Sequence, residues 1–173
     1  VMLHLFQQYS FQIGIAHCNF QLRDKEADAD EIFVKKTAEK ANIAFFSVRF
    51  DTKIYARKQG ISIQMAAREL RYTWFQEIAR QNDFTYIATA HHRDDVLETF
   101  FVNMLRKTGI KGLSGIKAKN GNIVRPLLPF SRQEIQEYAE TNHIQYREDE
   151  SNKSDYYTRN YIRHHIIPAF RKL

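Results

Sequence analysis

Cysteine is nearly absent from this sequence: Cys18 is the only one among 173 residues. A single thiol excludes an intramolecular disulfide, and it excludes zinc or iron–sulfur sites built from several cysteines. No apolar run approaches the ~18 residues that a membrane-spanning helix needs. We therefore expect a protein of the reducing cytoplasm that has no membrane partner.

Acidic residues are missing from the stretch between Thr99 and Gln133, which carries seven lysines and arginines. The end of the chain adds further cations at Arg159, Arg163, Arg171 and Lys172, and the formal net charge is +6. Clustered positive charge without local counter-charge indicates a polyanionic partner such as RNA. A basic surface that serves only solubility is the alternative.

Glycine and proline are scarce, with six and three residues, so most of the chain is free to form helices and strands. Strand patterns occur at 12–18, 43–48 and 85–90, and helix patterns at about 1–9, 28–42, 62–79 and 92–106. Strands separated by helices of this length pair in parallel. The chain length suits one domain, so we expect a single α/β domain with a parallel sheet.

The pattern changes after Gly109, because four of the six glycines fall between 109 and 121. The dipeptide Asn120-Gly121 lies between extended runs and predicts a hairpin. Ser131 and Glu134 form a capping box for a helix to about Thr141. A last helix over about 155–165 is expected to stop before Pro168. These features predict a small hairpin and a helical C-terminal extension.

Residues 90–99 hold the densest titratable chemistry of the chain. His91, His92, Asp94, Asp95 and Glu98 follow an apolar run directly, at the point where a strand gives way to a helix. Ligands of open α/β sheets bind at the carboxyl ends of strands, so this is a candidate active site.

The helix at this point has two expected faces. Asp95 and Glu98 stand at i and i+3, which directs both carboxylates to one place. The opposite face is expected to be a buried stripe of Leu97, Phe101, Met104 and Leu105.

Three other interpretations of the cluster stay open. The side chains of His91, His92, Asp94 and Asp95 are of the types that hold metals in a phosphohydrolase. The basic stretches alone are typical of a non-catalytic RNA-binding module. The acidic residues also suit an ordinary solvated helix N-terminus.

Five segments in order resemble the motifs of the tRNA(Ile)-lysidine synthetases, within the PP-loop ATP pyrophosphatase superfamily. They cover nearly the whole chain: Ala16-His17-Cys18-Asn19-Phe20-Gln21-Leu22-Arg23, Ala66-Ala67-Arg68-Glu69-Leu70-Arg71-Tyr72, Ala90-His91-His92 with Asp95, Glu98 and Thr99, Arg125-Pro126-Leu127-Leu128, and Asp149-Glu150-Ser151-Asn152 with Arg159-Asn160-Tyr161-Ile162-Arg163. A tRNA-thiolating relative is disfavoured because that chemistry commonly uses paired cysteines.

The resemblance implies an adenine-nucleotide hydrolase-like (Rossmann-like) domain that joins L-lysine to the wobble cytidine of tRNA(Ile) with a CAU anticodon. It implies ATP as the activating substrate and Mg²⁺ as the cation at its phosphates. Whether the chain forms a homodimer is left open.

Most candidate site residues follow from the resemblance position by position, whereas the lysines follow from the basic stretch between Thr99 and Gln133. Those expected to act in catalysis are Asp95, Glu98 and Arg71. Those expected near the nucleotide are His17, Asn19, Arg68, His91 and His92. Those expected to bind tRNA are Lys107, Lys111, Lys117, Arg159 and Arg163.

Two departures from the family pattern stand out. Val96 occupies the position where the family usually has glutamine, and the phosphate-binding Ser-Gly-Gly-x-Asp-Ser loop is absent. The start at Val1 resembles the helix that follows this loop. We therefore expect residues 1–173 to be one catalytic domain, with the loop upstream and tRNA-binding domains downstream; a degenerate, inactive domain is the alternative.

Two geometric expectations complete the hypothesis. Asp95 should face a solvent-filled cleft and contribute little to folding. Arg163 should lie within salt-bridge reach of an acidic group or a nucleotide phosphate of the cleft. Its helix should pack through Tyr157, Tyr161 and His164 or His165.

Overall fold

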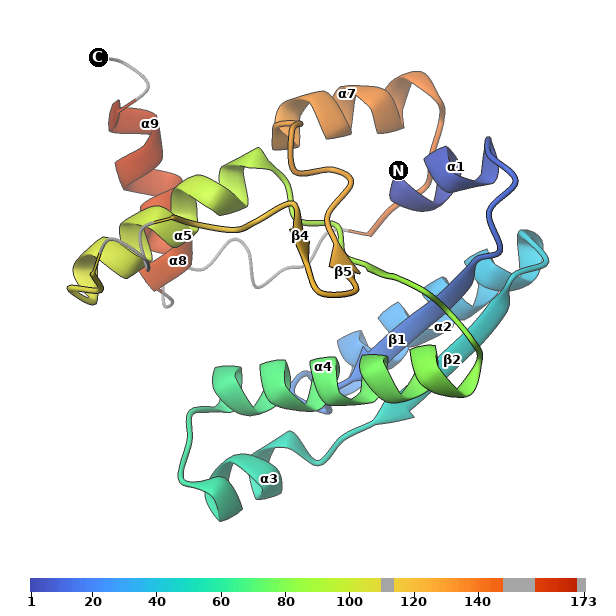
Figure 1. Ribbon diagram of the computed structural model, residues 1–173, viewed down its shortest axis with the longest axis horizontal. Coiled ribbons are helices and arrows are strands. Elements are labelled where there is room, and N and C mark those ends of the chain that lie inside the picture. Colours follow the sequence, from blue (N-terminus) through green and yellow to red (C-terminus); the bar gives the residue numbers. More distant parts are fainter. Residues whose placement is uncertain (110–113, 148–157, 171–173) are drawn as a thin grey trace. The chain divides into compact units, whose positions relative to one another are not determined.

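The computed structural model describes residues 1–109, 114–147 and 158–170. The chain divides into two compact units. The N-terminal unit comprises Phe6–Ile87, and the C-terminal unit comprises Val1–Leu5 with Ala88–Leu173. Figure 1 shows their helices and strands along the chain, beginning with the short helix α1 (Met2–Gln7).

The N-terminal unit is built on two parallel strands, β1 (Gly14–Asn19) and β2 (Ala44–Arg49). Their register runs from Gly14 opposite Ala44 to Asn19 opposite Arg49. Helix α2 (Asp24–Lys40) connects the strands and packs against both. The predicted strand–helix–strand unit with parallel pairing is confirmed.

Gly14 permits a close approach at the start of β1. A Cβ atom at this position would lie 2.6 Å from the ring of Phe84 and 3.1 Å from the ring of Phe46. These two rings meet edge to face, with centroids 6.2 Å apart. Any larger residue at position 14 would therefore displace the aromatic packing.

Two further helices, α3 (Thr52–Gln59) and α4 (Ile63–Gln81), pack on each other. The predicted cap of α4 is confirmed, since the Ser62 side chain accepts a hydrogen bond from the Met65 N–H. No apolar periodicity in the sequence marks helix α3, because five of its eight residues are polar or charged. An Asp51 cap and a left-handed Gly60 bound it.

A three-stranded sheet has the order β3-β5-β4. It contains β3 (Ile87–Ala88) and the antiparallel hairpin of β4 (Lys119–Asn120) and β5 (Ile123–Val124). The hairpin is confirmed, but its two-residue loop is Gly121-Asn122, with Gly121 at φ 59°, and not Asn120-Gly121. The strand expected at 85–90 is only two residues long and lies beside β5.

Two helices of the C-terminal unit begin at side-chain caps. Helix α5 (Arg93–Leu105) follows His92, and α7 (Arg132–Thr141) follows the predicted Ser131–Glu134 capping box, which is confirmed. Hydrogen bonds from Ser131, together with Arg93, hold the pKa of Glu134 below its ordinary value. His4 contacts the Tyr138 hydroxyl at 3.1 Å and so connects the first residues of the chain to α7.

The end of the described chain is a continuous helical segment with a π-helical turn in its middle. It consists of α8 (Thr158–Tyr161), η2 (Ile162–Ile166) and α9 (Ile167–Phe170). The expected stop before Pro168 is wrong. Pro168 is the second residue of α9, in the first turn of an α-helical element, where proline is tolerated.

The core between α5 and this segment contains Phe101, Ile162 and Ile167, with Val102 and Ile166 packed around it. The expected packing through Tyr161 is wrong, because Tyr161 is 49% exposed and Asn160 and Ile162 face inward instead. Tyr157 lies outside the described residues. His164 and His165 are exposed.

The apolar stripe expected on α5 is only partly buried. Phe101 is 8% exposed, but Leu97, Met104 and Leu105 are 38%, 48% and 62% exposed. The helix is rotated so that Glu98 and Phe101, one turn apart, form its inner face. In the part of the chain that the structure describes, no helix has the length and apolar character to cross a membrane.

Candidate functional site

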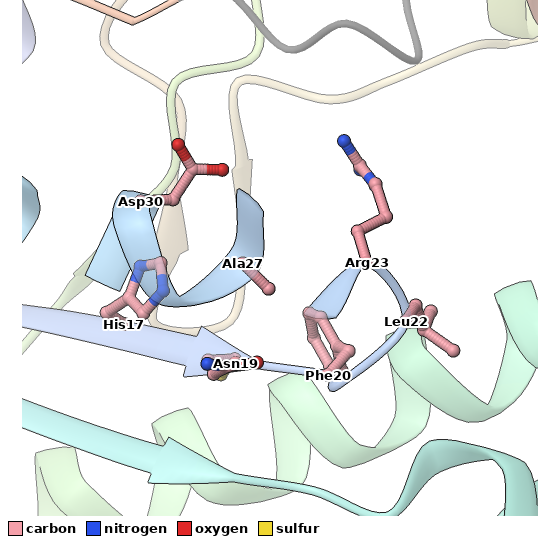
Figure 2. Close-up of a pocket in the computed structure, with 8 residues that line it drawn as sticks. His17, Asn19, Phe20, Leu22, Arg23, Ala27 and Asp30 are labelled. Atoms are coloured by element: carbon pink, nitrogen blue, oxygen red, sulfur yellow. The ribbon is translucent and has the colours of Figure 1, made fainter. Parts of the chain in front are cut away.

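A pocket opens at the carboxyl end of β1, where the strand passes into α2. Figure 2 shows Asn19 at the tip of the strand, Phe20 and Leu22 in the loop, and Arg23 and Asp30 reaching from α2 and its start. His17, Cys18 and Ala27 complete its lining. Its volume is about 110 Å³, below the roughly 300 Å³ of the smallest typical ligand sites. This pocket is therefore too small to enclose a whole nucleotide.

Asn19, expected beside the nucleotide, is 2% exposed and fully engaged with protein groups. Its amide nitrogen donates to the carboxylates of Asp28 at 3.1 Å and Glu31 at 3.0 Å, and its amide oxygen accepts from the Gln21 N–H at 3.0 Å. Arg49 on β2 contacts the same two carboxylates at 3.0 and 2.9 Å. Asn19 thus holds the loop and α2 in place beside the pocket.

His17 and Cys18 precede Asn19 on β1, and burial shifts the pKa of both side chains. Desolvation lowers the pKa of His17, although the charges of Glu31 and Asp30 oppose the shift. Desolvation also raises the pKa of Cys18 to about 11, against the charge of Arg71. At neutral pH, His17 is an uncharged imidazole and Cys18 an uncharged thiol.

Arg68 and Arg71 of α4 do not converge on one point within their unit. The Arg68 guanidinium lies 4.9 Å from the ring centroid of Tyr72, whereas that of Arg71 lies 5.1 Å from the centroid of Phe20. Phe20 lines the β1 pocket. Arg71 therefore reaches this pocket only through Phe20, whereas Arg23 lines it directly. Arg68 is on the exposed side of α4.

In the C-terminal unit, the residues before α5 form a hydrogen-bonded helix start. The His92 N–H donates to the Asp95 carboxylate at 2.9 Å, and the His92 imidazole Nε2 lies 3.5 Å from the same oxygen. His91 Nδ1 and the Thr89 hydroxyl share a hydrogen bond of 2.9 Å. The expectation that Asp95 faces a solvent-filled cleft is wrong: its side chain is 15% exposed and caps the helix.

Asp94 is directed elsewhere and accepts from the Arg132 N–H at the start of α7, at 3.0 Å. Among residues 1–109, 114–147 and 158–170, no three His, Cys, Asp or Glu side chains lie close enough together to hold a metal ion. The geometry therefore gives no support to the metal-dependent phosphohydrolase interpretation.

Glu98 is the centre of a buried ion-pair network. Its side chain has no exposed surface, and its two carboxylate oxygens contact Arg163 Nε at 2.6 Å and Arg159 Nε at 3.0 Å. Arg159 also donates to the Thr99 hydroxyl at 2.6 Å. The expectation that Arg163 lies within salt-bridge reach of an acidic group is confirmed.

The network depends on the helical segment that carries the arginines. Arg159 and Arg163 are i and i+4, and the π-helical turn begins between them at Ile162. Burial disfavours the Arg163 charge, but the hydrogen bond to Glu98 and the charges of Glu98, Asp95 and Asp94 raise its pKa. Arg163 is therefore a permanent cation paired with the Glu98 carboxylate.

The basic stretch between Thr99 and Gln133 is only partly described by the structure. Lys107 and Lys117 are exposed, whereas Lys111 lies outside the described residues. The motif Asp149-Glu150-Ser151-Asn152 also lies outside them.

Sequence reasoning assigned no role to three residues that the structure brings into pockets, namely Arg23, Asp30 and Arg125. Arg125 is 8% exposed, which is rare for arginine. Arg23 and Arg125 stand in two of the five segments that carry the family resemblance, and this was the signal that could have found them.

The sequence was compared with families and proteins of known identity. Residues 1–170 match the PP-loop domain family. The tRNA(Ile)-lysidine synthase of Parabacteroides distasonis is 46% identical over 157 residues, 91% of this chain and 36% of that protein. Those of Chlorobaculum tepidum and Petrotoga mobilis are 43% and 42% identical, over 99% and 100% of this chain and 53% and 55% of theirs. The chain thus spans between about a third and about half the length of these relatives.

Among solved structures, the chain resembles the U34-tRNA thiolase NcsA from Methanococcus maripaludis with its [4Fe-4S] cluster. The TM-score is 0.66 and the identity 18%, over 99% of this chain and 66% of the thiolase. This likeness concerns the fold alone.

Proposed function

This chain belongs to the PP-loop domain family, and from that premise we propose that it forms lysidine on tRNA(Ile) at the expense of ATP. The observation that carries the proposal is the consistent name of its curated relatives, which match at 39% to 46% identity over 91% to 100% of the chain. A metal-dependent phosphohydrolase would need a cluster of metal ligands, and the described residues contain no group of three or more His, Cys, Asp or Glu side chains that could hold a metal ion.

The proposed reaction replaces the carbonyl oxygen O2 of the wobble cytosine by the ε-nitrogen of lysine. The oxygen first attacks the α-phosphorus of ATP, and pyrophosphate leaves. The deprotonated lysine amine then attacks C2 of the adenylated base, and AMP departs with the original oxygen. Both steps depend on positioning and on neutralising phosphate charge.

For nucleotide binding, we propose that the β1 pocket takes the adenosine part of ATP. The lowered pKa of His17 makes it a neutral hydrogen-bonding partner, suited to a base or ribose and not to a phosphate. Asn19 acts as a positioning residue, because its polar atoms are occupied by Asp28, Glu31 and Gln21. Arg23 is the cation that lines this pocket, and Arg71 lies behind it, with its guanidinium over the Phe20 ring.

Mg²⁺ is proposed at the ATP phosphates. The described residues offer no cage of three or more ligands, which fits a cation held by substrate phosphates and one or two carboxylates. The bound cation would supply charge neutralisation.

In the C-terminal unit, we propose that Asp95 binds the lysine ammonium and helps to deprotonate it. Glu98 supports this role indirectly, because its Oε1 accepts a hydrogen bond from Arg163 and its Oε2 lies 3.0 Å from Arg159 Nε in an ion pair without a hydrogen bond among the described residues. Glu98 is thus a positioning residue that fixes the arginines. His91 and His92 orient the start of α5 through Thr89 and Asp95.

Asp95→Asn tests the proposal. The amide keeps an oxygen for the His92 N–H, so we expect the free energy of unfolding to change by less than about 1 kcal/mol. Loss of the carboxylate should reduce lysine incorporation by about 100-fold or more. The measurement is transfer of radiolabelled lysine to a tRNA(Ile) transcript with ATP by the full-length protein, beside denaturant unfolding.

A matched control is Asp83→Asn, which also removes one carboxylate. Asp83 is exposed and has φ 56°, a conformation that asparagine adopts readily. Its activity should equal that of the wild type. Full turnover by Asp95→Asn would remove Asp95 from the mechanism, and a wild-type protein that transfers no lysine would overturn the proposed function.

A further inference from the structure

Arg125 is a buried cation whose hydrogen bonding is incomplete. It is 8% exposed, and its Nη1 donates to the Lys117 carbonyl oxygen at 2.6 Å. Its Nε is buried and has no hydrogen-bond partner among the described residues. A buried donor without an acceptor is unfavourable, so this guanidinium edge favours a ligand that brings an acceptor.

Arg125 contributes to an open pocket of about 490 Å³ in the C-terminal unit. This volume lies within the range of about 300–1,000 Å³ that small-molecule sites occupy. Apart from Arg93 and Arg125, its lining is apolar: Val96, Leu97, Ile116, Ala118, Pro126, Leu128 and Pro129. Arg93 is already engaged with Glu134 at 3.1 Å. Arg125 is therefore the polar group that can select a ligand here.

The pocket's chemistry fits a flat group with apolar faces and a polar edge. Nε and Nη2 of arginine lie on one edge of the guanidinium and present two parallel donors, which match two adjacent acceptors. A phosphate would also match this edge, but its remaining oxygens would face apolar walls without donors. An unstacked nucleobase places its faces against such walls and its edge toward the donors.

Among the pyrimidines, cytosine presents two adjacent acceptors, O2 and N3, whereas uracil carries a hydrogen on N3. Exposed cations surround the segment that bears the pocket, including Arg106, Lys107, Lys117 and Lys119. Positive charge of this kind attracts the phosphates of single-stranded RNA and leaves its bases free to enter pockets.

We propose that this pocket receives an unstacked cytosine of the substrate RNA and that Arg125 is the residue that selects it, through its O2 and N3 edge. The proposal rests on the proposed function for its RNA substrate. According to this proposal, the segment around the β4–β5 hairpin determines which base is bound. The carboxylates of α5 play no part in this selection.

Equilibrium binding to an RNA hairpin with a CAU loop tests this assignment. The comparison is the same hairpin with a UAU loop, measured by fluorescence anisotropy at fixed salt. The wild-type protein should prefer the CAU loop by about tenfold, the discrimination typical of a bidentate contact. Arg125→Lys keeps the charge but not the paired donors, so it should bind both hairpins with equal affinity. Equal binding of the two loops by the wild type would overturn the proposal.

A second variant avoids the risk that Arg125 is needed for folding. Ala118 is exposed and lines the pocket, so Ala118→Trp should fill it and remove the preference for CAU while thermal unfolding stays near that of the wild type. Ala169→Trp, at an exposed position of α9, is the matched control and should keep the preference. A preserved preference in Ala118→Trp would contradict the assignment.

Inorganic phosphate, added at constant ionic strength, distinguishes an anion site from a base site. The CAU preference should persist at millimolar phosphate, and its loss would identify a phosphate site and overturn the proposal. The lysine-transfer assay separates this inference from the proposed function. Lysine transfer without any CAU preference refutes the pocket alone, whereas an Arg125-dependent CAU preference without lysine transfer supports the pocket and refutes the activity.

Discussion

At the scale of single residues, burial decides what a side chain can do more than its type does. Asn19 and His17 lie two positions apart on β1 and line one pocket. The Asn19 side chain is already hydrogen-bonded to Asp28, Glu31 and Gln21. His17 is a neutral imidazole, because desolvation lowers its pKa. One therefore supports the pocket and the other is available to a ligand.

The reactivity of the Cys18 thiol reports how strongly this environment is desolvated. Since burial raises the pKa of Cys18 to about 11, the rate of alkylation by iodoacetamide should increase about tenfold per pH unit from pH 8 up to about pH 11, because only the thiolate reacts. The measurement is mass-spectrometric labelling under pseudo-first-order conditions.

The unfolded chain is the control for Cys18. In denaturant, the same thiol should titrate near about 8.5, so its labelling rate should level off more than two pH units earlier. A folded-state rate that levels off below pH 9.5 would show that the thiol is not desolvated as described.

At the scale of secondary-structure elements, α5 joins the charged cluster to the C-terminal helical segment. Its inner face carries Glu98 and Phe101, which contact Arg163 and the Ile162–Ile167 core respectively. The π-helical turn at Ile162–Ile166 lies within this contact and brings Arg163 to the buried carboxylate. Such turns are frequent at functional sites.

Glu98→Gln tests how strongly this network holds the elements together. Replacing the carboxylate leaves two arginine side chains without their shared counter-charge, so the free energy of unfolding should fall by about 3 kcal/mol. The measurement is urea unfolding followed by circular dichroism.

Glu39→Gln is the control, because the Lys35–Glu39 pair on α2 is 4.0 Å apart and mostly exposed. Its loss should cost less than about 0.5 kcal/mol. Equal effects of the two substitutions would mean that the Glu98 network does not stabilise the fold.

At the scale of the whole molecule, the distribution of charge separates the roles of the segments. The stretch from Thr99 to Gln133 has seven cations and no acid, whereas α2 mixes both signs. A segment whose charges all have one sign attracts a polyanion through its electrostatic field. In a helix that carries charges of both signs, the fields of these charges largely cancel.

Replacing Lys107, Lys111 and Lys117 together by alanine should weaken tRNA binding. If each lysine neutralises one phosphate, the slope of log K against log salt should decrease in magnitude by about 2 to 3. ATP affinity should not change. The measurement is tRNA binding over a salt series.

The matched control removes Lys35, Lys36 and Lys40 from α2, which lowers the net charge by the same amount. This variant should keep the salt slope close to that of the wild type. An equal loss in both variants would indicate a response to net charge and not an RNA contact by the hairpin segment.

The sequence by itself determined the elements whose signals are local. The parallel β1–β2 pairing, the Ser62 and Ser131 caps and the hairpin all follow from periodicity or from hydrogen bonds within a few residues. Motif order was sufficient to indicate the family, because residue type and spacing carry that information without coordinates.

The tertiary structure alone decided which face of each helix is buried and which polar groups are already occupied. Helical spacing predicted that α5 buries Leu97, Phe101, Met104 and Leu105. Long-range contact with Ile162 and Arg163 buries Phe101 and Glu98 instead. The same kind of contact, the Lys117 carbonyl on Arg125, turned an ordinary cation into a buried one with an unsatisfied edge. Burial is a property of residues distant in the chain, so no local pattern could specify it.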